Sequence, residues 1–270
     1  LLLILLCLPM IGFGQNVNIP DANFKAYLVG NTAINTNGDT EIQLSEATEY
    51  DYEIGCYGEF ISDLTGIEAF TSLTSLNCSN NQLTGLDVSN NLALTNLICD
   101  FNQLTNLDLS NNLALIELNC GVNLITSLDV SNNLALTYLS CRFNQITNLD
   151  VSSNPNLIDL TCFNNQLTSL DVRNGNNTNF VNFDCNDNPN LFCINVDSIG
   201  IPPANFGNWS CNWPFYFSNN CSGTAIQEHT TKKELLKVTD LLGRETKGTK
   251  NEALFYIYDD GTVEKRIVIE

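Results

Sequence analysis

Cysteine is the residue type whose spacing in this sequence could carry chemistry. Seven of the eleven cysteines recur at intervals of 21 to 23 residues: Cys56, Cys78, Cys99, Cys120, Cys141, Cys162 and Cys185. A cysteine nucleophile needs a base beside it, and the one histidine of the chain, His229, lies beyond all seven. Zinc sites use short Cys-x-x-Cys pairs, which a 21-residue interval does not provide. We therefore predict buried free thiols that pack as small hydrophobic side chains.

Carboxylates recur with the same period. The repeated aspartates are Asp87, Asp108, Asp129, Asp150 and Asp171. A glycosidase needs two carboxylates in unequal environments within one cleft, whereas these five occupy equivalent positions. We predict that they form a solvated ladder of turns with local backbone hydrogen bonds, and that the protein is not an enzyme.

Near the N-terminus, four residues follow the ligand spacing of an EF-hand loop. Asn35, Asn37, Asp39 and Glu46 stand at loop positions 1, 3, 5 and 12. Thr40 replaces the usual turn glycine, and position 1 holds Asn in place of Asp. These residues are candidate calcium ligands, and calcium is the one cofactor that the sequence suggests. The alternative is a capping turn between a helix, Asp21 to about Val29, and the first repeat.

The 21-residue period also predicts the elements that must position these residues. The segment Leu76-x-Cys78-x-x-Asn81-x-Leu83-Thr-x-Leu86-Asp-Val88 recurs along the chain, and a coil of this size buries its apolar residues only by stacking on others. The Leu-x-Cys step alternates as a short parallel strand does. Inward Asn81 and its equivalents are expected to hydrogen-bond backbone groups that each turn leaves unpaired. We predict an α/β-type repeat solenoid of about seven coils over residues 51–197.

Residues beside the inward Leu and Cys positions vary from coil to coil and should face outward. The candidate binding residues in the middle coils are Ile98, Asp100, Phe101, Val122, Tyr138, Arg142, Phe143 and Phe163. Tyr, Phe and Arg are enriched among the residues that dominate binding energy at interfaces. Single exposed aromatic residues are also ordinary on protein surfaces, which is the alternative interpretation.

Charge excludes one class of partner. The chain has a formal net charge of −19, and residues 1–227 hold three basic and 21 acidic residues, a charge of −18. A nucleic-acid-binding surface needs Lys and Arg to displace counterions, so nucleic acid is not expected as a partner.

Residues 1–15 form an apolar run ending in small residues, which predicts a signal peptide that is N-terminally incomplete. We expect no transmembrane span, because this run is shorter than about 20 residues.

Three further cysteines follow the seven ladder cysteines. Cys193, Cys211 and Cys221 lie in or beside a loop-rich C-terminal cap and linker, residues 198–226, with Trp209 and Trp213. Secreted proteins usually form disulfides. We expect one disulfide here, Cys193–Cys221, with Cys211–Cys221 as the alternative.

The repeat closely resembles the leucine-rich repeats of the internalin J type. The resemblance rests on the 21-residue Leu-x-Cys-x-x-Asn-x-Leu-Thr-x-Leu-Asp-Val-Ser motif and its cysteine ladder, over roughly Ile54 to Asp197. It implies a curved right-handed solenoid with a parallel β-sheet on its concave face, and a small helical N-terminal cap at residues 16–50. It also implies a role at a cell surface, as an adhesin or binding module.

The tail, residues 227–270, resembles a C-terminal sorting domain of type IX secretion. The segments that carry the resemblance are Glu234–Glu245 and Leu254–Glu270, although the Asn-Pro motif usual near the start of that domain is absent. Apolar alternation around Asp-Asp-Gly independently predicts a small β-sandwich or set of hairpins. The resemblance implies export by a Gram-negative bacterium through the type IX machinery, to the outer cell surface or the medium.

Two functions follow from the sequence. The first is a recognition protein or adhesin that binds a protein or a glycan at a cell surface through its concave face. The alternative is a structural component of the surface or matrix with no specific ligand.

Overall fold

The structure is a computed structural model that describes residues 15–176, 179–197, 209–211, 216–221, 235–239, 253–258 and 263–267. The chain divides into two compact units, Leu1–Cys221 and Ser222–Glu270. The predicted signal peptide, apart from Gln15, lies outside the described residues, as does most of the predicted C-terminal cap and linker, residues 198–226. No helix in the described part of the chain is long and apolar enough to cross a membrane.

The first unit begins with two short helices. Helix α1 spans Ala22–Gly30, and Oδ1 of its N-cap residue Asp21 accepts hydrogen bonds from the first-turn amides. Helix α2 spans Leu44–Glu49 and begins with a capping box between Gln43 and Glu46. Buried side chains of both helices join the same hydrophobic core as the coils that follow.

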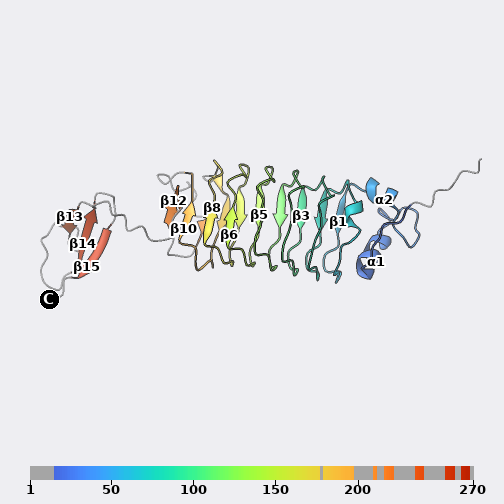
Figure 1. Cartoon of the computed structure of the whole chain (residues 1–270), viewed down its shortest axis with the longest axis horizontal. Helices are drawn as coiled ribbons and strands as arrows, with labels where there is room; N and C mark the ends of the chain where they lie inside the picture. Colours follow the sequence, from blue (N-terminus) through green and yellow to red (C-terminus); the bar gives the residue numbers. More distant parts are fainter. Residues whose placement is uncertain are drawn as a thin grey trace, which may run out of the picture. The chain divides into compact units, whose positions relative to one another are not determined.

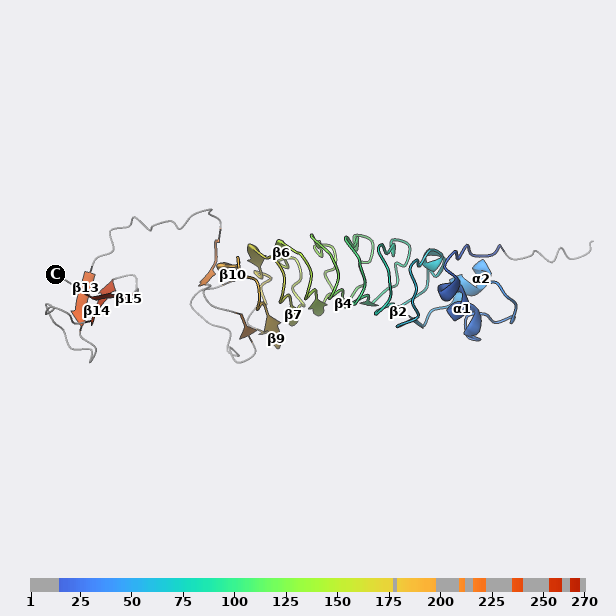
Figure 2. The same cartoon turned by 90° about the horizontal axis from the view of Figure 1, so that it is seen from below.

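The coils stack through an eight-stranded parallel sheet (Figures 1 and 2). Its strands, in spatial order, are β1 (Glu53–Gly55), β2 (Ser75–Asn77), β3 (Asn96–Ile98), β4 (Glu117–Asn119), β5 (Tyr138–Ser140), β7 (Asp159–Thr161), β9 (Asn182–Asp184) and β11 (Trp209–Ser210). In each of the first seven strands the middle residue is buried, as the Leu-x-Cys alternation predicts. Each of these strands ends just before its ladder cysteine. The predicted solenoid of about seven coils is confirmed, and β11 adds a rung beyond residue 197.

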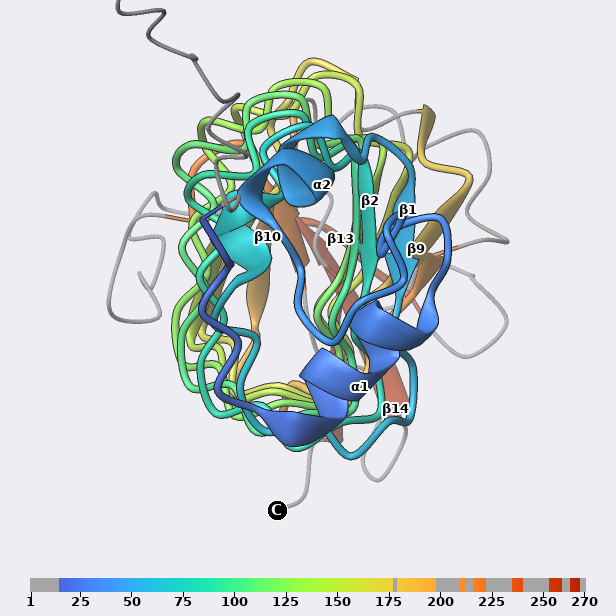
Figure 3. The same cartoon turned by 90° about the vertical axis from the view of Figure 1, so that its right-hand side faces the viewer.

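A second parallel sheet forms on the opposite wall of the later coils. It consists of β6 (Asn148–Asp150), β8 (Ser169–Asp171), β10 (Cys193–Asn195) and β12 (Tyr216–Ser218). Figure 3, which looks along the stack, shows β10 on one wall and β1, β2 and β9 on the other. The sequence did not predict this sheet. At Asp150 and Asp171 the expected aspartate ladder differs in part, because these residues end paired strands, although Oδ1 of each still accepts a hydrogen bond from the backbone amide two residues on.

The core consists of ladders that run from coil to coil. The ladders through Leu76, Leu83 and Val88 are buried along the central coils, and that through Leu86 is buried from Leu107 onward. A 3-10 helix, η1 (Ile67–Ala69), lies between β1 and β2, and the carbonyl of Ile67 accepts a hydrogen bond from Asn91 Nδ2 in the next coil. Because each ladder residue contacts its equivalents above and below, the core is continuous although no single coil has one.

Two columns of asparagine link the coils. In the first, Oδ1 of Asn123 accepts from Leu104 N, while its Nδ2 donates to the carbonyls of Cys99, Cys120 and Gly121. The equivalent residues Asn81, Asn102, Asn144, Asn165 and Asn188 repeat this pattern. The structural role predicted for this column is therefore confirmed. The second column, Asn91, Asn112, Asn133 and Asn154, was not recognised in the sequence, and its amides also donate to backbone carbonyls.

The cysteine ladder ends differently from the prediction. Six described cysteines, from Cys56 to Cys162, are buried and unpaired, as expected. Cys185 is not a free thiol, because it forms a disulfide with Cys211. Strand β11 stacks on β9, so Cys211 follows directly on the next rung, with a Cα–Cα distance of 4.8 Å. The second disulfide joins Cys193 to Cys221, the pair that the sequence favoured. Because Cys211 pairs with Cys185, all three cysteines that follow the ladder are in disulfides.

The second unit contains a three-stranded antiparallel sheet. Strand β14 (Ala253–Tyr258) pairs with β13 (Leu235–Thr239) on one side and with β15 (Val263–Ile267) on the other. The Asp-Asp-Gly segment lies between β14 and β15, outside the described residues. The assignment of this unit as a sorting domain stays a prediction.

Candidate functional site

The candidate site is the outward surface of the eight-stranded sheet together with the two residues that follow each ladder cysteine, which we call the strand face. Two outward rows are set by the strand register. The first row is Asn96, Glu117, Tyr138, Asp159 and Asn182, and the second is Ile98, Asn119, Ser140, Thr161 and Asp184. Because the strands are in register, side chains of one row stand beside each other along the stack.

Apolar side chains gather on the middle coils of the strand face. This apolar cluster comprises Ile98, Phe101, Val122, Tyr138, Phe143 and Phe163. Phe101 is 49% exposed and Phe143 is 42% exposed, whereas the other four are half-buried. The rings of Phe143 and Phe163 meet edge to face with centroids 5.0 Å apart. Phe143 and Phe163 thus form a paired aromatic contact, and Phe101 adds a half-exposed ring two coils from Phe143.

Arg142 is a basic side chain beside the apolar cluster. It lies over Gly121, where an added Cβ would come within 2.9 Å of Arg142 Cγ. Its Nη2 atom is 3.9 Å from Oδ2 of Asp100. Asp100 was expected to face outward, but it is only 7% exposed, since Arg142 and Asn119 cover it. Burial raises the pKa of the Asp100 carboxyl, although Asn119 and Arg142 act in the opposite direction.

Carboxylates surround the apolar cluster. Glu117 and Asp159 flank Tyr138 in the first outward row. Each accepts a hydrogen bond from an asparagine on a neighbouring strand, from Asn96 to Glu117 and from Asn182 to Asp159. Burial raises the pKa of Asp159. The strand face therefore combines apolar contact area with negative charge.

Three of the four candidate calcium ligands, Asn35, Asn37 and Asp39, lie in the loop before α2, and the fourth, Glu46, lies in the first turn of α2. Oε1 of Glu46 accepts from Thr36 N at 2.8 Å, and its Oε2 accepts from Gln43 N at 3.0 Å. Oδ1 of Asn35 accepts from Gly38 N at 3.0 Å. These bonds form a capping turn, the alternative that the sequence left open. Among the described residues, no group of three or more His, Cys, Asp or Glu side chains is arranged to hold a metal, and calcium binding stays a prediction.

The aspartate ladder makes the local bonds expected of it. Oδ1 of Asp129 accepts from Ser131 N at 2.9 Å, and Asp87 and Asp108 bond in the same way to the serine two residues on. Hydrogen bonds from these serines lower the pKa of each of the three carboxyls. These three carboxylates thus share one environment.

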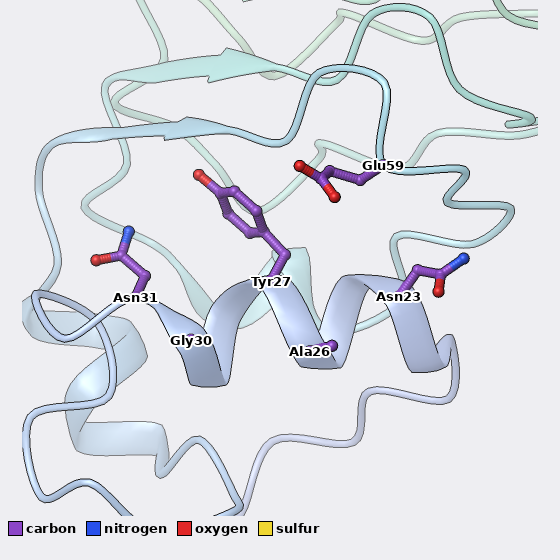
Figure 4. Close-up of a pocket in the computed structure, with 6 residues that line it drawn as sticks. All are labelled: Asn23, Ala26, Tyr27, Gly30, Asn31 and Glu59. Atoms are coloured by element: carbon purple, nitrogen blue, oxygen red, sulfur yellow. The ribbon is translucent and has the colours of Figure 1, made fainter.

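A separate hollow lies between α1 and the first coil (Figure 4). It is lined by Asn23, Ala26, Tyr27, Gly30, Asn31 and Glu59. Asn23 Nδ2 donates to the Phe60 carbonyl, and the Tyr27 hydroxyl accepts from Gly55 N. Because these polar groups attach α1 to the first coil, we do not assign a ligand to this hollow.

One exposed apolar column was missed at the sequence level. Leu92, Leu113 and Leu134 are 59%, 61% and 55% exposed and occupy equivalent positions in three consecutive coils. The signal was present in the recurring Asn-Asn-Leu-Ala-Leu segment, in which the second leucine, such as Leu94, is buried and the first is exposed. This column lies in the turn before each strand and provides a second apolar surface of the solenoid.

Comparisons with known proteins agree with this architecture. No protein-family model matches the sequence. A stretch of 73 residues is 42% identical to internalin J of Listeria monocytogenes and makes up 27% of this chain and 8% of that protein. The solved functional domain of InlJ from the same species, which includes a cysteine ladder, is 27% identical over 76% of this chain and 62% of its own, with a TM-score of 0.31.

A second solved internalin shows the fold. InlF of Listeria monocytogenes is 23% identical, and the match covers 70% of this chain and 55% of that chain with a TM-score of 0.53. The chain therefore shares the leucine-rich-repeat fold of InlF. It covers less than two thirds of the length of each of these three relatives.

Proposed function

We propose that this chain is a recognition module that binds a protein partner through its strand face. The observation that carries the proposal is the apolar cluster on the middle coils, where Phe101 and Phe143 are nearly half exposed beside Arg142. Aromatic residues and arginine are the types that dominate binding energy in protein interfaces. The similarity to internalins supports the proposal, because leucine-rich-repeat scaffolds of this kind are generally protein-interaction modules.

The proposal includes a location and excludes catalysis. We propose that the apolar N-terminus directs export, that the C-terminal unit serves type IX secretion, and that the protein acts at or outside the cell surface as an adhesin. The strand face offers contact area and charge but no nucleophile beside a base, since the one histidine lies outside it at position 229. A glycan ligand and a purely structural role are the competing possibilities.

Binding by matched variants tests the proposal. The purified chain would be titrated against panels of extracellular proteins, glycans and whole cells, with saturable binding as the readout. The strand-face variant carries Ile98→Ser and Tyr138→Ser, and the control carries Leu113→Ser and Leu134→Ser on the exposed leucine column. We expect the first variant to lose binding to a protein partner and the second to keep it.

Three other outcomes have distinct meanings. Loss of binding in the leucine-column variant alone would move the site to that column. Saturable binding to glycans without any protein partner would replace the proposed ligand class. Concentration-dependent assembly of the chain with no binding in any panel would favour the structural role.

A further inference from the structure

Every coil passes through the left-handed backbone region at an equivalent position, two residues after the ladder cysteine. The residues there are Gly58, Asn80, Phe101, Val122, Phe143, Asn164 and Asp187, with φ between 51° and 71°. Glycine, asparagine and aspartate adopt this conformation readily. A bulky or β-branched side chain is strained in it, by roughly 1–2 kcal/mol.

The stack itself imposes this conformation. The amide of the left-handed residue donates to a carbonyl of the next coil: Phe101 N to Gly121 O at 3.1 Å, and Val122 N to Arg142 O at 2.8 Å. Asn80 and Asn164 make the equivalent bond at 2.9 Å. Since asparagine and phenylalanine coils have the same backbone, the side chain does not determine the geometry. The strain at Phe101, Val122 and Phe143 is held in place by the surrounding structure.

Burial of the two phenylalanine rings does little to offset this strain. Phe101 and Phe143 keep 49% and 42% of their surface exposed, whereas ladder residues such as Leu104 are fully buried. Asparagine at the same position in the second and sixth coils shows that the scaffold folds without an aromatic ring there. Strained residues that the fold does not require are typical of ligand-binding positions.

We propose that Phe101, Val122 and Phe143 form a strained contact ridge that binds an apolar, positively charged segment of a protein partner. This proposal rests on the proposed function of the strand face and identifies its contact residues and the chemistry of its partner. The charge of the partner follows from complementarity. Glu117 and Asp159 flank the cluster, residues 1–227 carry a charge of −18, and Arg142, the one cation nearby, faces Asp100.

Two triple variants separate strain from contact. One changes Phe101, Val122 and Phe143 to Asn, and the other changes the same three residues to Ala. Both remove the apolar side chains and keep the net charge, but only asparagine is suited to the left-handed region. We expect the Asn variant to melt at least about 2 °C above the Ala variant. Equal melting temperatures, or a lower one for Asn, would overturn the assignment of strain.

The binding arm uses a short fluorescent peptide of alternating lysine and leucine, with lysine–serine and glutamate–leucine peptides as controls. We expect saturable binding of the lysine–leucine peptide that weakens at least about tenfold in both triple variants. Non-specific attraction to the acidic chain stays the same in the variants, because their charge is unchanged. Undiminished binding in the variants, or equal binding of the glutamate–leucine peptide, would overturn the ridge or its partner chemistry.

The strand-face variant with Ile98→Ser and Tyr138→Ser distinguishes the two proposals. If it loses a protein partner that both triple variants still bind, the strand face is the site and the contact ridge is wrong. If none of these variants affects the binding of a partner, both proposals fail together.

Discussion

The guanidinium of Arg142 lies 3.9 Å from the carboxylate of Asp100, two coils away, because the coil between them has glycine at position 121. A Cβ atom at Gly121 would come within 2.9 Å of Arg142 Cγ and 3.2 Å of the Arg142 carbonyl oxygen. The Arg142 carbonyl oxygen accepts a hydrogen bond from the backbone amide of Val122. Gly121 thus provides the space in which Arg142 crosses the strand face.

The first prediction concerns this arrangement. Gly121→Ala should destabilise the protein by about 1–3 kcal/mol, because the added methyl group meets backbone that the inter-coil hydrogen bond holds in place. Arg142→Gln should cost less than about 1 kcal/mol, since the ion pair is long and its arginine is partly exposed. Urea unfolding of both variants measures the difference. A larger cost for Arg142→Gln than for Gly121→Ala would contradict this account.

The two asparagine columns should differ in their contribution to stability. Asn123 satisfies one amide and three carbonyls with its side chain. Asn133 donates to two carbonyls, and its buried Oδ1 has no partner among the described residues. Each buried polar group left unpaired costs about 1–3 kcal/mol. Asn123→Ala should therefore cost at least about 1 kcal/mol more than Asn133→Ala in chemical unfolding, and equal costs would show that the unpaired Oδ1 carries no penalty.

The solenoid was predictable because its signals repeat. The inward ladders and the Asn81 column recur at a fixed interval, and stacking requires the equivalent residues to share one environment. The second sheet was not predictable in the same way. The Leu-Asp-Val segment is nearly the same in the coils of Asp108 and Asp150, yet the strands begin only at Asn148.

The site was predicted less completely than the fold. Outward positions follow from the strand alternation, but Asp100 is covered by Arg142 from a coil 42 residues later, a contact that strand alternation does not reveal. Periodicity also argued that adjacent cysteines remain unpaired, which is wrong for Cys185. Its partner Cys211 lies 26 residues away, outside the regular interval, on a rung that the pattern did not include.

The attachment of α1 to the first coil should depend on pH. Oδ1 of Asp21 caps α1, and Oδ2 accepts from the backbone and hydroxyl of Ser62. Burial acts to raise the pKa of Asp21, but hydrogen bonds from Phe24 and Ser62 outweigh it, so the pKa is lowered. A carboxyl with a lowered folded pKa stabilises the protein above its ordinary value of 3.8, and this contribution is lost as the pH falls through the folded pKa.

Asp21→Asn should accordingly destabilise the protein by about 1 kcal/mol at neutral pH. The difference from the wild type should shrink as the pH is lowered past 3.8, because the wild-type carboxyl then becomes protonated. Thermal unfolding of both proteins across this range is the measurement. A difference that stays constant with pH would show that the charge of Asp21 plays no part.

Calcium should leave the stability of the chain unchanged. The carboxylate oxygens of Glu46 already accept hydrogen bonds from the amides of Thr36 and Gln43. A bound ion would therefore have to break the hydrogen bonds that cap α2. We expect the same melting temperature in a chelator and in millimolar calcium. A rise of several degrees with calcium, abolished by Asp39→Asn, would instead establish the EF-hand-like loop as a calcium site.

The ten cysteines among the described residues should divide into six unreactive thiols and two disulfides. Burial raises the pKa of the ladder thiols, to about 12 for Cys56, so the reactive thiolate is scarce at neutral pH. Alkylation of the folded protein should therefore leave Cys56, Cys78, Cys99, Cys120, Cys141 and Cys162 unmodified, and alkylation in denaturant should modify all six.

Peptide mapping without reduction should recover Cys185 linked to Cys211 and Cys193 linked to Cys221. These two bonds fasten β11 to β9 on one wall and the segment after β12 to β10 on the other. Cys185→Ser and Cys193→Ser should each lower the melting temperature, because each frees one wall of the last coil. Recovery of Cys162 linked to Cys185 would contradict this arrangement, since it would place the disulfide one rung lower in the ladder.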